Sequence, residues 1–173
     1  RQRMANAAAA SQWKTVLAIA DDHPQLLVCA EMSSLWTVGE AFARSDQTQR
    51  ALDLYIYVLT NCSDPGERVG TVQKANELLS GEMVDDLLKL ERAGVDGEGE
   101  FGMVRADMLR GRVGAAAQDT SKVVSDEVLT KLEDFAREKQ LAGDAELLGF
   151  YFFGHDRNAD AVSWFETALE WGG

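Results

Sequence analysis

The sequence is poor in three residue types that shape folds or carry chemistry, with two prolines, two cysteines and two histidines in 173 residues. Because proline breaks helices, its scarcity favours long uninterrupted helices. Cys29 and Cys62 form no C-x-x-C pair, and neither has a histidine at ligand spacing, which argues against a zinc site. We interpret both as small buried apolar residues, with a disulfide as the alternative if the chain is extracytoplasmic.

Basic residues are also in short supply. The chain has 17 Lys and Arg against 29 Asp and Glu, a formal net charge of −12. This balance argues against binding to nucleic acid or to an anionic membrane, because both need a locally basic surface. No apolar run approaches the roughly 20 residues that span a bilayer. With 46% hydrophobic and 27% charged residues, the composition is that of a folded protein.

Apolar residues recur at helical spacing along most of the chain, and no stretch alternates long enough to predict a strand. The expected fold is all-α, with about nine helices mostly arranged as consecutive antiparallel pairs. The predicted helices cover residues 13–20, 25–44, 48–60, 67–79, 82–92, 103–117, 121–140, 144–153 and 158–171. Ser45 and Asp46 are expected to cap the third helix, and Pro65 to open the fourth. Because the chain stops directly after a helix, we expect it to be a segment of a longer protein.

A Gly-rich acidic connector at 94–102 interrupts this pattern. Its G-x-G-x-x-G spacing formally matches a dinucleotide-binding loop, but a helix precedes it where a strand is needed. Glu98 and Glu100 would also repel a pyrophosphate. As a calcium loop, the segment has Phe101 where the sixth-position glycine is required. We therefore predict a linker here, with no cofactor and no metal site.

Seven positions recur with identical spacing near the two ends of the chain, 110 residues apart. The first set is Leu35, Val38, Gly39, Phe42, Ala51, Tyr55 and Val58, and the second is Ala145, Leu148, Gly149, Phe152, Ala161, Phe165 and Ala168. We expect the glycines and alanines to let two paired helices approach closely. The aromatic residues then fill the wedge between them.

This pattern resembles the tetratricopeptide repeat, a helix–turn–helix unit of 34 residues, near 32–65 and 142–173. The resemblance implies antiparallel helix pairs stacked as a right-handed solenoid. It further implies divergent pairs over 66–141 and a single helical-repeat domain over 1–173. An irregular helical bundle is the alternative.

The resemblance also implies a concave groove lined by the first helix of each pair. The residues that we carry over as partner-binding are Trp36, Glu40, Arg44, Glu146, Phe150 and Phe153. Aromatic side chains at these positions would hold a partner segment or stack on sugar rings. The alternative is that they pack against neighbouring helices.

Residues 148–169 also resemble the aromatic-rich repeats of periplasmic scaffolds in bacterial exopolysaccharide export, of the cellulose and Pel type. This narrower resemblance implies a periplasmic stalk below an outer-membrane pore. It favours the periplasm over the cytoplasm as the compartment, and polysaccharide or export proteins as contacts.

The predicted function is a non-catalytic scaffold for protein–protein contacts in a larger bacterial assembly, with the export scaffold as the alternative. An enzyme is a third hypothesis, although no G-x-S-x-G elbow accompanies the two histidines. The expected partner is a protein or a polysaccharide, not nucleic acid or a membrane. Trp164, Leu169 and Trp171 on the last helix suggest self-association through that helix.

Overall fold

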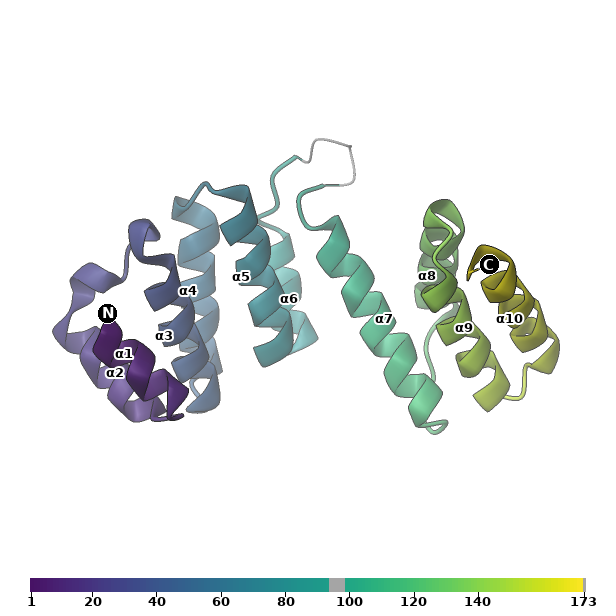
Figure 1. The fold of residues 1–173 in the computed structure, drawn as a ribbon, viewed down its shortest axis with the longest axis horizontal. Coiled ribbons are helices and arrows are strands. Elements are labelled where there is room, and N and C mark those ends of the chain that lie inside the picture. The colour runs from purple at the N-terminus through teal and green to yellow at the C-terminus, as the bar shows by residue number, and fades with distance from the viewer. Residues whose placement is uncertain (94–98, 173) are drawn as a thin grey trace. The chain divides into compact units, whose positions relative to one another are not determined.

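The computed structural model describes residues 1–93 and 99–172 and confirms the predicted all-α fold, since no strand occurs in these two ranges (Figure 1). The elements are α1 (Gln2–Ala9), α2 (Trp13–Asp22), η1 (Pro24–Leu26), η2 (Cys29–Glu31), α3 (Met32–Arg44), α4 (Thr48–Asn61), α5 (Pro65–Leu78), α6 (Gly81–Leu88), α7 (Gly102–Gln118), α8 (Asp126–Lys139), α9 (Ala142–Gly154) and α10 (Asn158–Gly172). η1 and η2 are single turns of 3-10 helix.

The chain divides into two compact units, unit 1 at Arg1–Val104 and unit 2 at Arg105–Gly173. The division falls just after the predicted Gly-rich connector, of which residues 94–98 lie outside the described residues. The single domain over 1–173 and the solenoid stacking remain predictions.

Unit 1 is built from helices that pack on their neighbours in sequence and on the next helix but one. α3 contacts α4 and α5, and α4 contacts α5 and α6, so the α3–α4 and α5–α6 pairs stack on each other (Figure 1). Its buried core includes Val16, Leu35, Val38, Tyr55 and Val72. Pro65 opens α5 as predicted, and the Asp64 side chain before it caps the helix by accepting a hydrogen bond from the Glu67 amide.

Unit 2 centres on the α9–α10 pair, and α8 packs on α9. Its apolar core is formed by Val113, Ala116, Leu129, Leu132, Ala136, Ala145, Leu148, Tyr151, Phe152, Ala161 and Trp164. An ion pair joins two helices here: Arg110 on α7 donates to both carboxylate oxygens of buried Asp144 on α9, at 2.6 and 2.9 Å. Bidentate pairs of this kind fix orientation as well as distance.

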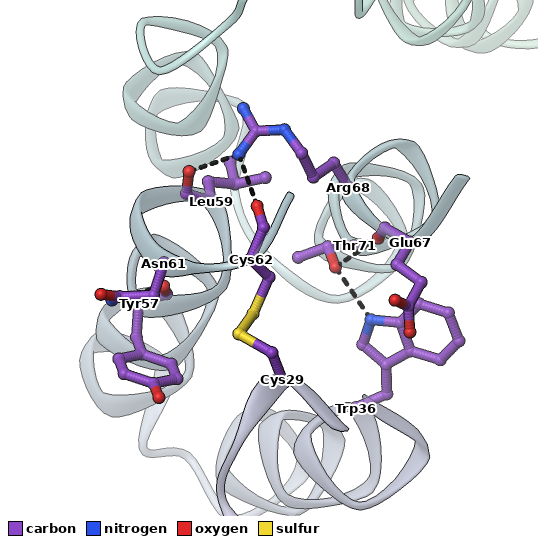
Figure 2. Close-up of a disulfide and its surroundings, with 9 residues drawn as sticks. All are labelled: Cys29, Trp36, Tyr57, Leu59, Asn61, Cys62, Glu67, Arg68 and Thr71. Carbon is purple, nitrogen blue, oxygen red and sulfur yellow. Dashed lines mark hydrogen bonds between the residues drawn. A yellow bond between two sulfur atoms is a disulfide. The ribbon is translucent and has the colours of Figure 1, made fainter. Parts of the chain in front are cut away.

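The predicted helix at 25–44 is wrong over its first seven residues. Two 3-10 turns flank extended Val28, and the α-helix begins only at Met32. A disulfide joins Cys29 to Cys62, with the two Cα atoms 5.5 Å apart, and holds Cys29 at the C-terminal end of α4 (Figure 2). The disulfide alternative is therefore correct. Cys62 is buried as the main interpretation expected, whereas Cys29 is only partly buried.

One helix was missed, and the ends of two others differ from the prediction. Helix α1 was not predicted, because its alanine run gives little apolar contrast, although Met4 and Ala7 are buried. Helix α8 begins at Asp126 and not at 121, since the Ser125 side chain caps it by accepting from the Val128 amide. Helix α6 ends at Leu88, four residues earlier than predicted.

The turn inside each repeated pair has the same backbone geometry. The predicted Ser45–Asp46 cap is wrong, because Gln47 precedes α4 without a side-chain cap. Asp46 instead takes a left-handed conformation at φ 58°, and Asp156, 110 residues later, does the same at φ 61°. In both turns the residue that follows donates its amide to the carbonyl of an aromatic residue, Phe42 or Phe152, at 2.9 Å. The sequence duplication thus extends to local structure.

The two repeated pairs also share one close contact between helices. A Cβ atom added at Gly39 would lie 2.7 Å from Cε1 of Tyr55, and one added at Gly149 would lie 2.6 Å from Cε1 of Phe165. Real Cβ atoms do not approach other atoms so closely. Each glycine therefore lets an aromatic ring of the partner helix lie directly on its backbone.

Substitution of Gly149 by alanine should destabilise unit 2 by about 1–3 kcal/mol, because the added methyl group overlaps the Phe165 ring. Gly111 on α7 is the matched control, since a Cβ there meets nothing within 4 Å. Gly111→Ala should be neutral or stabilise the chain by up to about 1 kcal/mol. Denaturant unfolding of both variants measures the difference, and equal free energies of unfolding would contradict the packing described here.

Candidate functional site

The six predicted partner-binding residues lie in different units. Trp36, Glu40 and Arg44 are on α3 of unit 1, and Glu146, Phe150 and Phe153 are on α9 of unit 2. Each group is described within its own unit.

Trp36 packs against α5 and is partly buried. Its Nε1 donates to Oγ1 of Thr71 at 2.9 Å, and its ring lies 3.2 Å from the position of a Cβ at Gly70 (Figure 2). The ammonium group of Lys74 lies 4.8 Å from the ring centroid. The indole thus holds α5 on α3, in line with the alternative reading in which the predicted aromatics pack against neighbouring helices.

Glu40 and Arg44 pair with each other one helical turn apart, at 2.9 Å. The Arg44 guanidinium also lies 5.7 Å from the Trp13 ring centroid. Both side chains are exposed enough for water to screen the pair, which is worth well under about 1 kcal/mol. They form a surface pair on one helix, and Arg44 also lines a shallow hollow with Trp13, Lys14 and Asp46.

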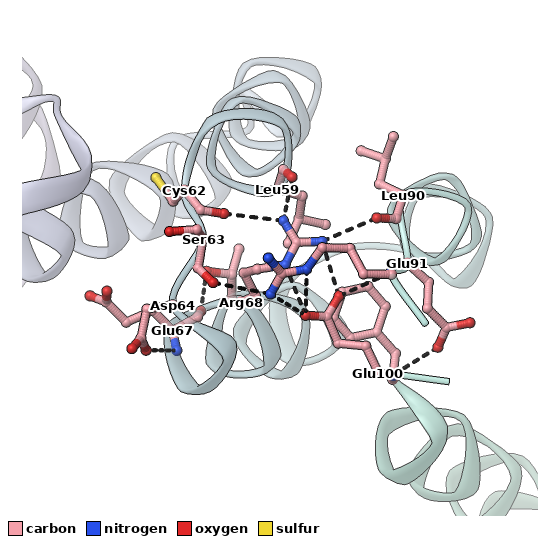
Figure 3. Close-up of polar contacts among 12 residues, drawn as sticks. Leu59, Cys62, Ser63, Asp64, Glu67, Arg68, Leu90, Glu91 and Glu100 are labelled. Carbon is pink, nitrogen blue, oxygen red and sulfur yellow. Dashed lines mark hydrogen bonds and ion pairs between the residues drawn. The ribbon is translucent and has the colours of Figure 1, made fainter. Parts of the chain in front are cut away.

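The strongest polar cluster of unit 1 surrounds Arg68, which sequence reasoning missed. Its guanidinium is buried and donates to the carbonyls of Leu59, Cys62 and Leu90 and to both oxygens of Glu100 (Figure 3). Arg92 donates to the same carboxylate at 2.9 Å. The partners come from positions up to 32 residues away, so no local spacing could have revealed them.

The electrostatics of this cluster favour the ionised carboxylate. Burial alone would raise the pKa of Glu100, but hydrogen bonds from Arg68 and Arg92 outweigh it and lower the pKa to about 2. The cluster joins Glu100, near the C-terminal end of the connector, to the turn between α4 and α5 (Figure 3). Nε, Nη1 and Nη2 of Arg68 all donate to groups of this chain, so we interpret the cluster as structural.

Of the three predicted aromatic residues, Phe150 and Phe153 are exposed, at 52% and 65%. Phe150 lies edge-on to Phe165 of α10, with ring centroids 5.1 Å apart. Next to it is an open groove of about 520 Å³, here called the α9–α10 groove. It is lined by Ala142, Gly143, Glu146, Phe150, Phe165, Ala168, Leu169 and Gly172.

The walls of the α9–α10 groove are apolar and carry one charge. Glu146 is the charged residue among the described residues that line it. Leu169, which sequence reasoning assigned to self-association, is 77% exposed at its edge. Such a surface can bury apolar side chains of a partner and pair one cation, but it offers no nucleophile.

A second hollow, here called the Trp pocket, lies on another part of unit 2. It is lined by Glu133, Arg137, Phe152, Arg157, Asp160, Ser163, Trp164, Thr167, Glu170 and Trp171. The Trp164 and Trp171 rings lie 6.4 Å apart in an edge-to-face arrangement, and the Arg137 guanidinium lies 4.7 Å from the Trp164 centroid. Burial raises the pKa of Glu133, and the charge of Arg137 offsets this in part. The pocket combines aromatic surface with hydrogen-bonding groups.

The two histidines lie in different units and have local roles. Nε2 of His155 lies 3.0 Å from the Ala116 carbonyl, and the ring stacks on Tyr151 at 4.2 Å. Nδ1 of His23 lies 3.3 Å from Nε2 of Gln25. Across residues 1–93 and 99–172, no group of three or more His, Cys, Asp or Glu side chains is placed to hold a metal ion. No described helix is both long enough and apolar enough to cross a membrane.

Replacement of Glu100 by glutamine should destabilise unit 1 by about 3 kcal/mol at neutral pH, because it leaves buried Arg68 without its counter-charge. The folded-state pKa is below the unfolded value of 4.5, so this stability is complete above about pH 5. It is lost as pH falls towards 2, and Glu100→Gln should flatten that acid-induced loss.

Glu77 is the matched control, because its side chain is exposed on α5. Glu77→Gln should change the free energy of unfolding by less than about 0.5 kcal/mol. Urea unfolding at pH 7, 5 and 3 gives these values. A Glu100→Gln variant with the wild-type pH dependence would contradict the role of the carboxylate.

Comparisons of the chain with protein family models, with curated proteins and with solved structures found no match.

Proposed function

We propose that this chain is a non-catalytic module that binds another protein through the apolar surface of α9 and α10. The observation that carries the proposal is the exposure of Phe150 and Leu169 at the α9–α10 groove, together with that of Phe153 one helical turn after Phe150 on α9. Aromatic residues are enriched in protein interfaces, and contiguous exposed apolar surface marks binding sites.

The roles of the polar groups support binding over catalysis. Arg68 pairs with Glu100 and donates to backbone carbonyls, and Arg110 pairs with Asp144. His155 is held by a ring stack and a backbone contact. A general base or nucleophile needs a partner group within hydrogen-bond reach of a substrate space. Neither the α9–α10 groove nor the Trp pocket contains a histidine, serine–histidine pair or cysteine among its described lining.

Site-specific photo-crosslinking tests this function. A photoreactive amino acid at Phe153 or Leu169, introduced in the cells from which the gene comes, should capture the same protein from both positions. Val123 is the matched control, an apolar residue of the same unit that is 79% exposed but lies outside α9 and α10. Capture from all three positions alike, or from none, would contradict an interface on α9 and α10.

Two observations favour a second candidate, an extracytoplasmic scaffold that contacts exopolysaccharide. The Cys29–Cys62 disulfide is typical of oxidising compartments, and the Trp pocket combines tryptophans with carboxylates and hydroxyls, as saccharide sites do. We include bacterial export of the cellulose or Pel type in this candidate on the resemblance of residues 148–169.

Titration with soluble oligosaccharides, followed by tryptophan fluorescence, tests the second candidate. A saturable change that Trp171→Ala abolishes and Trp13→Ala preserves is the expected result, because Trp171 lines the pocket and Trp13 lies in unit 1. An unchanged spectrum at millimolar sugar, or thiols that alkylate freely in intact cells, would rule out this candidate.

A further inference from the structure

The α9–α10 groove has a counterpart elsewhere in the same chain. Each lining residue has an equivalent position 110 residues earlier, at the offset that relates Gly149 to Gly39. The counterparts are Met32, Ser33, Trp36, Glu40, Tyr55, Val58, Leu59 and Cys62. The chain therefore contains two versions of one helix-pair face, and they can be compared directly.

In unit 1 that face is covered by a helix. α5 packs on both α3 and α4, and Trp36 donates to Thr71 of α5 (Figure 2). Tyr55 and Val58 are fully buried, and Leu59 is 4% exposed. In unit 2 the residue at the position of Leu59 is Leu169, which is 77% exposed. The helix-pair face of unit 1 thus binds an α-helix, α5.

Helix α5, which covers the face in unit 1, places a positively charged side chain at the C-terminal end of α4. Arg68 of α5 donates to the carbonyls of Leu59 and Cys62, at the C-terminal end of α4, where the helix dipole is negative (Figure 3). Leu169 and Gly172 take these positions at the end of α10, with Glu170 between them. The corresponding place in unit 2 is therefore suited to a positive charge.

The charges of α9 and α10 also favour a positively charged partner. These two helices contain five carboxylates and no lysine or arginine. Glu146 stands inside the groove where unit 1 has Trp36, and Phe150 stands where unit 1 has Glu40. A helix that fits must therefore face Glu146 with a basic residue and Phe150 with an apolar one.

We propose that the α9–α10 groove binds an amphipathic, basic α-helix of a separate polypeptide, seated as α5 is seated on α3 and α4. This inference rests on the proposed function and names the partner's chemistry. A second copy of this chain fits less well, because each copy carries a net charge of −12 and presents an acidic face. Helices that dock in grooves are recognised by apolar residues at i, i+3 or i+4, and i+7.

A display library tests the proposal on the whole chain. The library holds 16-residue peptides on a helix-favouring frame, randomised on one face, and the tightest binder is then synthesised. Recovered peptides should carry an apolar stripe with lysine or arginine beside it, and their helical circular dichroism should rise on binding. Phe150→Asp and Leu169→Asp should each lower the affinity of the chain for the synthetic peptide at least tenfold.

Two further variants distinguish specific binding in the groove from nonspecific binding of the peptide. Val123→Asp, at an exposed site outside the groove, should leave the affinity within about twofold. Glu146→Lys should weaken binding about three- to tenfold, and a peptide with lysine exchanged for glutamate should restore it. The exposed positions of all four substitutions keep the fold intact, which the far-ultraviolet spectrum verifies.

Three outcomes overturn the proposal. One is a binder that tolerates both Phe150→Asp and Leu169→Asp, and another is a set of binders that stay extended or are acidic. The third is dimerisation that Leu169→Asp abolishes, which assigns the groove to a second copy. If photo-crosslinking at Phe153 still captures a protein while the library yields no helix, the groove inference fails and the protein-binding function stands.

Discussion

The contact on which the rest of the structure depends is that between a glycine backbone and an aromatic ring of the paired helix. It occurs twice, between Gly39 and Tyr55 and between Gly149 and Phe165. Because no side chain separates the helices at these points, each pair is held at a fixed close distance. The same rings also form part of each pair's outer face, and Phe165 supports exposed Phe150 edge-on. Packing inside the pair thus shapes the surface that a partner would meet.

The two copies of this contact show how one packing rule yields different surfaces. On the first pair α5 covers the face, and the disulfide and Arg68 hold the end of α4 against its neighbours. On the second pair the corresponding face holds Phe150, Glu146 and Leu169 beside an open groove. Tyr55 carries a buried hydroxyl that has no hydrogen-bond partner in the described part of the chain, and burial raises its pKa well above its usual range. The equivalent residue of the second pair is Phe165, which has no hydroxyl group to leave without a hydrogen bond.

The spacing of apolar and small residues predicted the features that depend on residues close together in the sequence. Helical periodicity located α2, α4, α5, α7, α9 and α10 to within a few residues. The repeated Gly and Ala positions predicted where two helices meet. The start of α3 was missed because it depends on a cysteine 33 residues away, and α1 was missed because alanine hardly marks a buried face.

The candidate site was predictable only in part, for a related reason. The same reasoning assigned Trp36 and Phe153 to a groove, yet one packs under α5 and the other is 65% exposed. Position within a repeat does not reveal whether another helix covers it. Arg68 and Glu100 escaped notice because their pairing spans 32 residues and the connector.

The most direct measurement of the central contact is the proton NMR spectrum of the two repeat glycines. An aromatic ring seated on a backbone shifts the Hα protons beneath it upfield and gives strong cross-relaxation between them. The Hα protons of Gly39 and Gly149 should therefore show upfield shifts and cross-peaks to the rings of Tyr55 and Phe165, respectively, whereas Gly111 should show neither. Ordinary shifts without those cross-peaks at 39 and 149 would contradict the account.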